Sequence, residues 1–381
     1  TAFVLDKENV ESGSDWTSRP NGTGPFKLAE WEIGSKLRLE RNDLFYNNPP
    51  HLSSVNFILS GGVGMTMYEN DEIDFTGVGL SDIDRVLDPT DDLNSELLTA
   101  PPDYSVSYMG FNTQVEPFDD INIRQSLSLA INKELIASAV LSDLLVPAYG
   151  ILPPGFPGFN QNLVGLRFDP EKAMHLLATS NYGKQNPEIA QDLMLADVTD
   201  DPEERMALLQ QASAKAAANL PTIILSVAGG GGAVGLDTEV ILEMWREYLG
   251  VDVEIQQSEF ATFLNDLDRK RYQMFQLGWV ADYPDPQNFL DIFFHSKSSN
   301  NHTGYGNAEV DRLLEKARTE SDVETRIALY QQTEQLIIDD APWIPTWYEG
   351  DRYILIKPNV KGYILSPLII PKLKFVYLEP Q

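Results

Sequence analysis

The stretch that decides the fold class runs from residue 222 to residue 279 and reads TIILSVAGGGGAVGLDTEVILEMWREYLGVDVEIQQSEFATFLNDLDRKRYQMFQLGW. Three apolar runs in it have the length and composition of strands, and they lie at 222–227, 251–255 and 272–279. Two segments between them have helical character, and they lie at 238–249, ahead of Gly250, and at 261–269. Strands that alternate with helices in this way predict an α/β lobe.

The segments on both sides extend this mixture. Upstream, residues 1–100 carry strand and turn patterns, the clearest of which is the alternation of charged and apolar residues at 36–41. Downstream, amphipathic helices are expected at 309–318 and 323–339, and strand character then returns. At 381 residues the chain is longer than one core usually needs, so we expect two lobes.

The composition narrows the class of function. Hydrophobic residues make up 43% and charged residues 22% of the chain, as in ordinary globular proteins. The 28 Lys and Arg against 57 Asp and Glu give a net charge of −29, which repels phosphate backbones and argues against a nucleic-acid partner. Cysteine is absent, which excludes disulfides, thiolate metal sites and cysteine nucleophiles. The sequence has no run of about 18 apolar residues that would span a membrane, and no signal-peptide pattern begins at Thr1.

Tests for common chemistry find no catalytic or metal-binding motif. No two of the four histidines have the i, i+4 spacing of a helical zinc pair. Residues 229–235 lie between a predicted strand and a predicted helix, but they lack the Gly-Lys-Ser/Thr end of a phosphate-binding loop, so a strand–helix connection is expected. No Gly-x-Ser-x-Gly nucleophile motif occurs. We therefore expect no catalytic residue, no metal and no cofactor.

One constellation suggests a ligand site, and it lies at residues 278–286, which read GWVADYPDP. Asp282 lies between Trp279 and Tyr283 at the end of an apolar strand. A carboxylate there can accept charge-assisted hydrogen bonds from an ammonium group, and the aromatic rings add apolar area and cation–π attraction. The alternative is a turn with a capping aspartate and core aromatics. The residue types alone do not separate the two.

A series of different short motifs lies along nearly the whole chain, in a fixed order. They lie at 22–28 with Trp31, 39–42, 109–113 with 117–118, 123–126, 130–133, 147–148, 153–155, 168–173, 278–289, and at Tyr305, Asn307, Asp311 and 340–342. In this order and spacing the sequence resembles the family 5 extracellular solute-binding proteins, the oligopeptide- and dipeptide-binding receptors of ABC importers.

The resemblance implies a type II periplasmic-binding-protein-like fold, in which two α/β lobes close over a ligand without doing chemistry. Residues 1–105 would form a strand-rich part of lobe I, and residues 106–342 would form lobe II, with a helical insertion near 184–219. Residues 343–381 would return to lobe I. Nothing like the family's N-terminal stretch precedes Thr1. We therefore expect a C-terminal portion of a receptor, with the first lobe incomplete at the N-terminus.

The resemblance also implies a ligand site. The family's acid that binds the α-amino group of a peptide falls on Asp282, and the three residues before it match positions that line the peptide and pair with its main chain. Aromatic side chains, including Tyr305 from a later loop, would wall the site. The predicted ligand-binding residues are Asp282, Trp279, Val280, Ala281, Tyr283 and Tyr305.

The function expected from the resemblance is capture of extracellular oligopeptides and their delivery to the membrane permease of an ABC importer. We expect a monomer outside the cytoplasm, either periplasmic or tethered to the cell surface as a lipoprotein. A second hypothesis keeps the fold and changes the ligand to an oligosaccharide or another solute, because aromatic walls suit sugar rings as well. A third, a hydrolase with Asp282 and Asp285 as paired carboxylates, is disfavoured because Asp285 lies between two prolines and no orienting base accompanies it. A fourth is a structural or signalling domain on the same scaffold.

Overall fold

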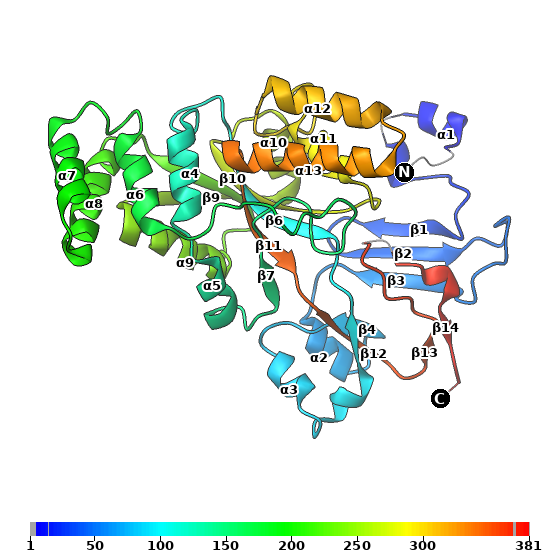
Figure 1. The fold of residues 1–381 in the computed structure, drawn as a ribbon. Helices are drawn as coiled ribbons and strands as arrows, with labels where there is room; N and C mark the ends of the chain where they lie inside the picture. Colours follow the sequence, from blue (N-terminus) through cyan, green and yellow to red (C-terminus); the bar gives the residue numbers. More distant parts are fainter. Residues whose placement is uncertain (1–4, 14, 369–370, 381) are drawn as a thin grey trace. The chain divides into compact units, whose positions relative to one another are not determined.

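Two units make up the described chain, which comprises residues 5–13, 15–368 and 371–380 of a computed structural model (Figure 1). Unit 1 is formed by Thr1–Asp103 and Asp351–Gln381, and unit 2 by Tyr104–Gly350. Residues 343–350 belong to unit 2, because strand β11 (Trp343–Glu349) pairs with β6 and β7 of that unit, and the return segment expected from residue 343 stays a prediction. That the two units are the lobes of a receptor stays a prediction.

Unit 2 is built on a mixed sheet of six described strands in the order β7-β11-β6-β10-β8-β9 (Figure 1). Their bounds are Leu145–Pro147 (β7), Trp343–Glu349 (β11), Ser105–Phe111 (β6), Met274–Val280 (β10), Ile223–Ala228 (β8) and Val253–Ser258 (β9). β8 runs parallel to both β9 and β10, while the pairs β10–β6, β6–β11 and β11–β7 are antiparallel. The three strands predicted within residues 222–279 are β8, β9 and β10, and the predicted α/β class is confirmed.

Helices of unit 2 begin where the sequence offers caps. Asp169 and Asp201 accept hydrogen bonds from first-turn N–H groups of α6 and α8, and each is followed by proline at the first helical position. The segment predicted as a helical insertion contains α7 and α8, and the two amphipathic helices predicted downstream are α12 and α13. The bounds are Ile121–Leu129 (α4), Lys133–Ala139 (α5), Pro170–Thr179 (α6), Pro187–Val198 (α7), Pro202–Ala217 (α8), Leu236–Met244 (α9), Phe260–Asp268 (α10), Leu290–Phe294 (α11), Ala308–Thr319 (α12) and Val323–Asp340 (α13).

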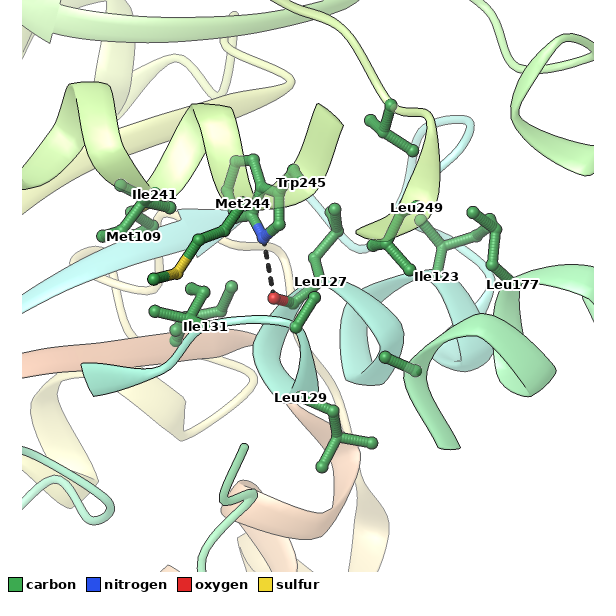
Figure 2. Close-up of a cluster of buried hydrophobic side chains, with 14 of the residues drawn as sticks. Met109, Ile123, Leu127, Leu129, Ile131, Leu177, Ile241, Met244, Trp245 and Leu249 are labelled. Atoms are coloured by element: carbon green, nitrogen blue, oxygen red, sulfur yellow. Dashed lines mark hydrogen bonds between the residues drawn. The ribbon is translucent and has the colours of Figure 1, made fainter. Parts of the chain in front are cut away.

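A core of aliphatic and aromatic side chains joins the sheet of unit 2 to α4, α6, α8 and α9. Figure 2 shows its centre, where the fully buried Trp245 donates a hydrogen bond from Nε1 to the Leu127 carbonyl at 2.8 Å. Trp245 begins a π-helical turn, Trp245–Leu249, that continues α9. The turn ends at Gly250, whose φ of 71° is the left-handed conformation that glycine adopts without strain. The helix predicted at 238–249 is thus present, with a wider last turn.

Unit 1 contains small sheets with the orders β1-β2-β3, β4-β12-β5 and β13-β14 among its described residues. Strand β12 pairs with β4 on one side and with β5 on the other, so the C-terminal segment completes a sheet begun more than 250 residues earlier. The alternation predicted at 36–41 is β2. The strands are Phe26–Glu32 (β1), Lys36–Arg41 (β2), Ser54–Ile58 (β3), Phe75–Gly77 (β4), Leu97–Ala100 (β5), Arg352–Ile356 (β12), Val360–Lys361 (β13) and Tyr377–Leu378 (β14), and the α-helices are Lys7–Glu11 (α1), Gly64–Glu69 (α2) and Ile83–Leu87 (α3).

Candidate ligand-binding site

Strand β10 has one fully paired edge and one partly unpaired edge. It is bound to β6 along its whole length, from Met274 opposite Phe111 to Val280 opposite Ser105. On the other edge only Met274 and Phe275 are paired, and their partner is β8. Beyond Phe275, no strand in the described part of the chain pairs with β10 on that edge.

The hydrogen bonds of β10 show which backbone groups face the unpaired edge. The N–H of Ala281 donates to the Tyr104 carbonyl at 2.8 Å, and in an antiparallel pair only every second residue bonds to the same neighbour. The N–H and C=O groups of Gly278 and Val280 therefore point away from β6. Gly278 is exposed and has no side chain to obstruct the edge. An extended chain placed there can pair with β10 as an added strand.

Asn288 fixes the backbone and the indole at the end of this strand. Its side chain is fully buried, and its Oδ1 accepts hydrogen bonds from the N–H of Asp282 at 2.9 Å and from Nε1 of Trp279 at 3.3 Å. The Trp279 ring packs edge-on against Phe293, with 4.9 Å between the ring centroids. One buried amide thus connects two of the predicted ligand-binding residues.

The side chain of Asp282 is exposed. Its backbone N–H is held by Asn288, but none of the described residues donates a hydrogen bond to its carboxylate or forms an ion pair with it. The carboxylate is therefore available to a cationic group of a ligand. Its role as an anchor stays a prediction.

The other residues predicted on this loop differ in how accessible they are. Val280 is partly buried, and its backbone faces the unpaired edge. Ala281 is fully buried, and its N–H donates to the Tyr104 carbonyl, so neither its side chain nor its N–H is available to a ligand. Tyr283 is partly buried and donates from its hydroxyl to Oε1 of Gln287 at 2.5 Å.

Tyr305 lies in a separate network. Its side chain is only 5% exposed, and its hydroxyl donates to Oδ2 of Asp340 at 2.6 Å. Asn307 donates to the same Asp340 oxygen at 2.8 Å. Burial, together with the hydrogen bond to Asp340, raises the pKa of the Tyr305 hydroxyl. These contacts account for Tyr305 without a ligand, and its predicted place in the wall of the site stays a prediction.

Two further contacts hold the loop that carries Asp282, and the sequence did not single them out. Oδ1 of Asp285 accepts hydrogen bonds from the Gln287 N–H at 3.0 Å and from Nη2 of Arg326, on α13, at 2.7 Å. Gly158 packs against the same loop so closely that a Cβ there would lie 2.9 Å from Cγ of Pro286. The missed signal was the Asp-Pro pair at 285–286, because the same cap-and-proline pattern begins α6 and α8 and here begins a short 3₁₀ helix, Pro286–Asn288.

Comparison with known proteins gives the family. The family model described as bacterial extracellular solute-binding proteins, family 5 middle, matches residues 2–301. The chain belongs to this family. It is 28% identical over 362 residues to the oligopeptide-binding protein OppA of Bacillus subtilis and 29% identical over 373 residues to the dipeptide-binding protein DppE of the same organism, alignments that cover 94% and 96% of this chain.

Solved structures agree with the fold. The periplasmic binding protein DppA from Helicobacter pylori, solved in complex with the peptide STSA, matches with a TM-score of 0.78 at 22% identity. That match covers 99% of this chain and 68% of the other, and it supports a type II periplasmic-binding-protein fold. The chain spans only 60% and 61% of the lengths of the two Bacillus relatives.

The described residues contain neither a membrane-spanning helix nor a metal-binding cluster. No helix there has the length and apolar character required to cross a membrane. No group of three or more His, Asp or Glu side chains there is arranged to hold a metal ion.

Proposed function

We propose that this chain is the ligand-capturing part of an extracytoplasmic receptor that binds peptides and delivers them to the permease of an ABC importer. The observation that carries the proposal is the unpaired edge of β10, which ends at the exposed carboxylate of Asp282. An edge of this kind pairs with any extended main chain, so it binds peptides with little dependence on their sequence. The names of the relatives point to the same class of ligand.

The charges suit a ligand with a free amino terminus. Asp282 has no cationic partner among the described residues, so an α-ammonium group can form a charge-assisted hydrogen bond with it. The overall charge of −29 favours the approach of a cationic group. We therefore assign Asp282 to the peptide amino terminus.

Peptides fit this site better than sugars do. A sugar ring stacked on an aromatic side chain is usually also held by polar groups, but the Trp279 indole N–H is used by Asn288 and the Tyr283 hydroxyl by Gln287. The groups that stay free are the Asp282 carboxylate, which matches an ammonium group, and the main-chain N–H and C=O of Gly278 and Val280, which match another main chain. The site therefore favours a peptide over an oligosaccharide.

The receptor is proposed to release its ligand unchanged. Asp285, which a hydrolytic mechanism would pair with Asp282, is bound to Arg326 and to the Gln287 N–H. A carboxylate engaged in this way is poorly placed to act as a general acid or base. We also propose that the receptor acts as a monomer, without nucleic acid, outside the cytoplasm.

The test uses tetra-alanine with free termini and N-acetyl-tetra-alanine as probes. We expect calorimetry to show binding of tetra-alanine and about tenfold weaker binding of the acetylated peptide, which lacks the ammonium charge. Asp282→Asn should weaken binding of tetra-alanine by about the same factor and leave binding of the acetylated peptide unchanged. Asp197→Asn, at an exposed position on α7, is the matched control and should bind as the wild type does.

Three results would contradict parts of this proposal. Native mass spectrometry of protein purified without denaturation should show peptide masses, and glycan masses in their place would contradict the peptide assignment. Cleaved tetra-alanine after incubation would contradict a receptor that does no chemistry. If Asp282→Asn loses the same affinity for tetra-alanine and for the acetylated peptide, Asp282 does not bind the peptide amino terminus. The proposal that the protein captures peptides would be unaffected by that result.

A further inference from the structure

The buried amide of Asn288 is the strongest feature that the proposed function does not use. We propose that Asn288 is the positioning residue of the ligand site, and that it sets both the direction of the Trp279 indole and the backbone that presents the Asp282 carboxylate. The inference rests on the proposed function for what the site binds. The contacts that carry it lie within unit 2.

The orientation of the Asn288 amide follows from its two neighbours. The Asp282 N–H and the Trp279 Nε1–H are both donors, so both require the amide oxygen. With the amide reversed, its NH₂ group would face two donors and both hydrogen bonds would be lost. Nδ2 is buried, and no described residue accepts a hydrogen bond from it. The amide is therefore held in place by the hydrogen bonds that its oxygen accepts from Asp282 and Trp279.

The backbone that carries Asn288 is itself fixed from two sides. The carboxylate of Asp285 caps the 3₁₀ helix that ends at Asn288, and Arg326 holds that carboxylate from α13 at 2.7 Å. The hydrogen bond from Arg326 to Asp285 raises the pKa of the Arg326 guanidinium, which favours its charged form. On the other side, Pro286 packs against Gly158, where no Cβ would fit without a shift. A change at Arg326 should therefore reach Trp279 through Asn288.

A residue that fixes its neighbours in this way raises the affinity for a ligand, because fewer groups have to be ordered when the ligand binds. With Oδ1 in place, the Asp282 backbone and the Trp279 ring already have their bound directions before a ligand arrives. Without it, both must be ordered when the ligand binds, and that ordering counts against the affinity. Removal of the amide should thus weaken binding even though Asn288 is buried and does not reach the ligand.

The test combines affinity with a signal from Trp279 itself. We expect Asn288→Ala to weaken binding of tetra-alanine by about tenfold. The indole ¹⁵N–¹H resonance of Trp279, assigned by its loss in Trp279→Phe, should also move because its hydrogen-bond acceptor is gone. Asn288→Asp keeps an oxygen for both donors, so the Trp279 resonance should stay near its wild-type position. That rescue separates positioning from a general loss of stability.

Two controls and a second variant complete the design. Asn301→Ala removes another buried amide of unit 2, one that donates to His295 and Tyr305, and should lower stability without moving the Trp279 resonance. Arg326→Met should move the Trp279 resonance indirectly, because it frees Asp285 and so the backbone that carries Asn288. Arg312→Met breaks an exposed ion pair with Glu309 and should leave the resonance in place. Arg326→Met therefore tests the inference even if Asn288→Ala does not fold.

The outcomes separate the two proposals. An Asn288→Ala protein with wild-type affinity and an unmoved Trp279 resonance would overturn the positioning role while peptide capture stands. An unmoved resonance in Arg326→Met would overturn the path through Asp285. A wild-type protein that binds no tetra-alanine, but whose Trp279 resonance moves in Asn288→Ala, would contradict the proposed function and uphold the positioning of the loop.

Discussion

Glu334 is a buried carboxyl group on α13 that holds the backbone of residues 151 and 152. Its side chain is 1% exposed, and Oε1 accepts hydrogen bonds from the N–H groups of Ile151 at 2.7 Å and Leu152 at 2.9 Å. Oε2 has no hydrogen-bond partner among the described residues. Burial raises the pKa of Glu334 to about 7, although the two N–H groups oppose the shift. Glu334 thus holds an irregular segment in place, and its buried carboxyl group binds a proton more readily than an exposed one does.

This pKa predicts a pH dependence of stability. Between the ordinary value of 4.5 and about 7, folded Glu334 keeps a proton that the unfolded chain releases, so the free energy of unfolding should fall as the pH rises through this window. Glu334→Gln keeps an oxygen for both N–H groups and does not titrate. Relative to Glu334→Gln, the wild type should lose up to about 3 kcal/mol between the two ends of the window.

Urea unfolding of both proteins at several pH values measures this difference. All other titrating groups are shared, so their contributions cancel in the comparison. If the two stability curves run parallel across the window, Glu334 does not bind its proton more tightly in the folded state. If the wild type instead loses stability relative to Glu334→Gln as the pH falls, the pKa of Glu334 is not raised by folding.

At the scale of elements, the Trp245 side chain connects the π-helical turn after α9 to α4. Trp245 starts this turn, and its indole N–H bonds to the Leu127 carbonyl at the end of α4 (Figure 2). Trp245→Phe should lower the free energy of unfolding by about 1 to 3 kcal/mol, because it leaves a buried carbonyl without its donor and a space where the larger ring lay. Chemical denaturation followed by circular dichroism measures the loss.

The matched control for this change is Trp31→Phe in β1, where the side chain is 43% exposed. It should alter stability by less than about 0.5 kcal/mol. If the two variants lose equal stability, the hydrogen bond to Leu127 does not tie α9 to α4. A stable Trp245→Phe protein would lead to the same conclusion.

The elements show how much of this fold and site the sequence predicts. Apolar runs and caps are local, so β8, β9, β10 and the helices between them were predicted within a few residues. The pairing of β10 with β6 was out of reach, because it joins segments more than 160 residues apart, such as Trp279 opposite Val106. The unpaired edge of β10 follows from that pairing, so the residues alone did not indicate it, and main-chain pairing of residues 279–281 with a peptide was expected only from the resemblance.

The site divides in the same way. Asp282 and Trp279 stood out because an acid between aromatic residues is visible in the sequence alone. Asn288 did not, because its contact with Asp282 exists only once the turn at Asp285 has formed. The sequence also could not show that Tyr305 is bound by Asp340, 35 positions away.

The whole molecule carries a net charge of −29, and this charge should govern how fast charged ligands arrive. A tetrapeptide with lysine at both ends should associate faster than one with glutamate at both ends at low ionic strength. As salt rises from about 0.01 M to about 1 M the Debye length falls from about 30 Å to about 3 Å, which removes most of the long-range attraction and repulsion.

The association rate constant of the cationic peptide should therefore fall with added salt, and that of the acidic peptide should rise, while tetra-alanine changes little. Stopped-flow tryptophan fluorescence at several salt concentrations measures all three rates. Dissociation rates should respond less, because contacts inside the site are screened less than charges across solvent. If the cationic and acidic peptides show the same salt trend, the net charge does not steer ligands to this site, and the acidic surface serves solubility alone.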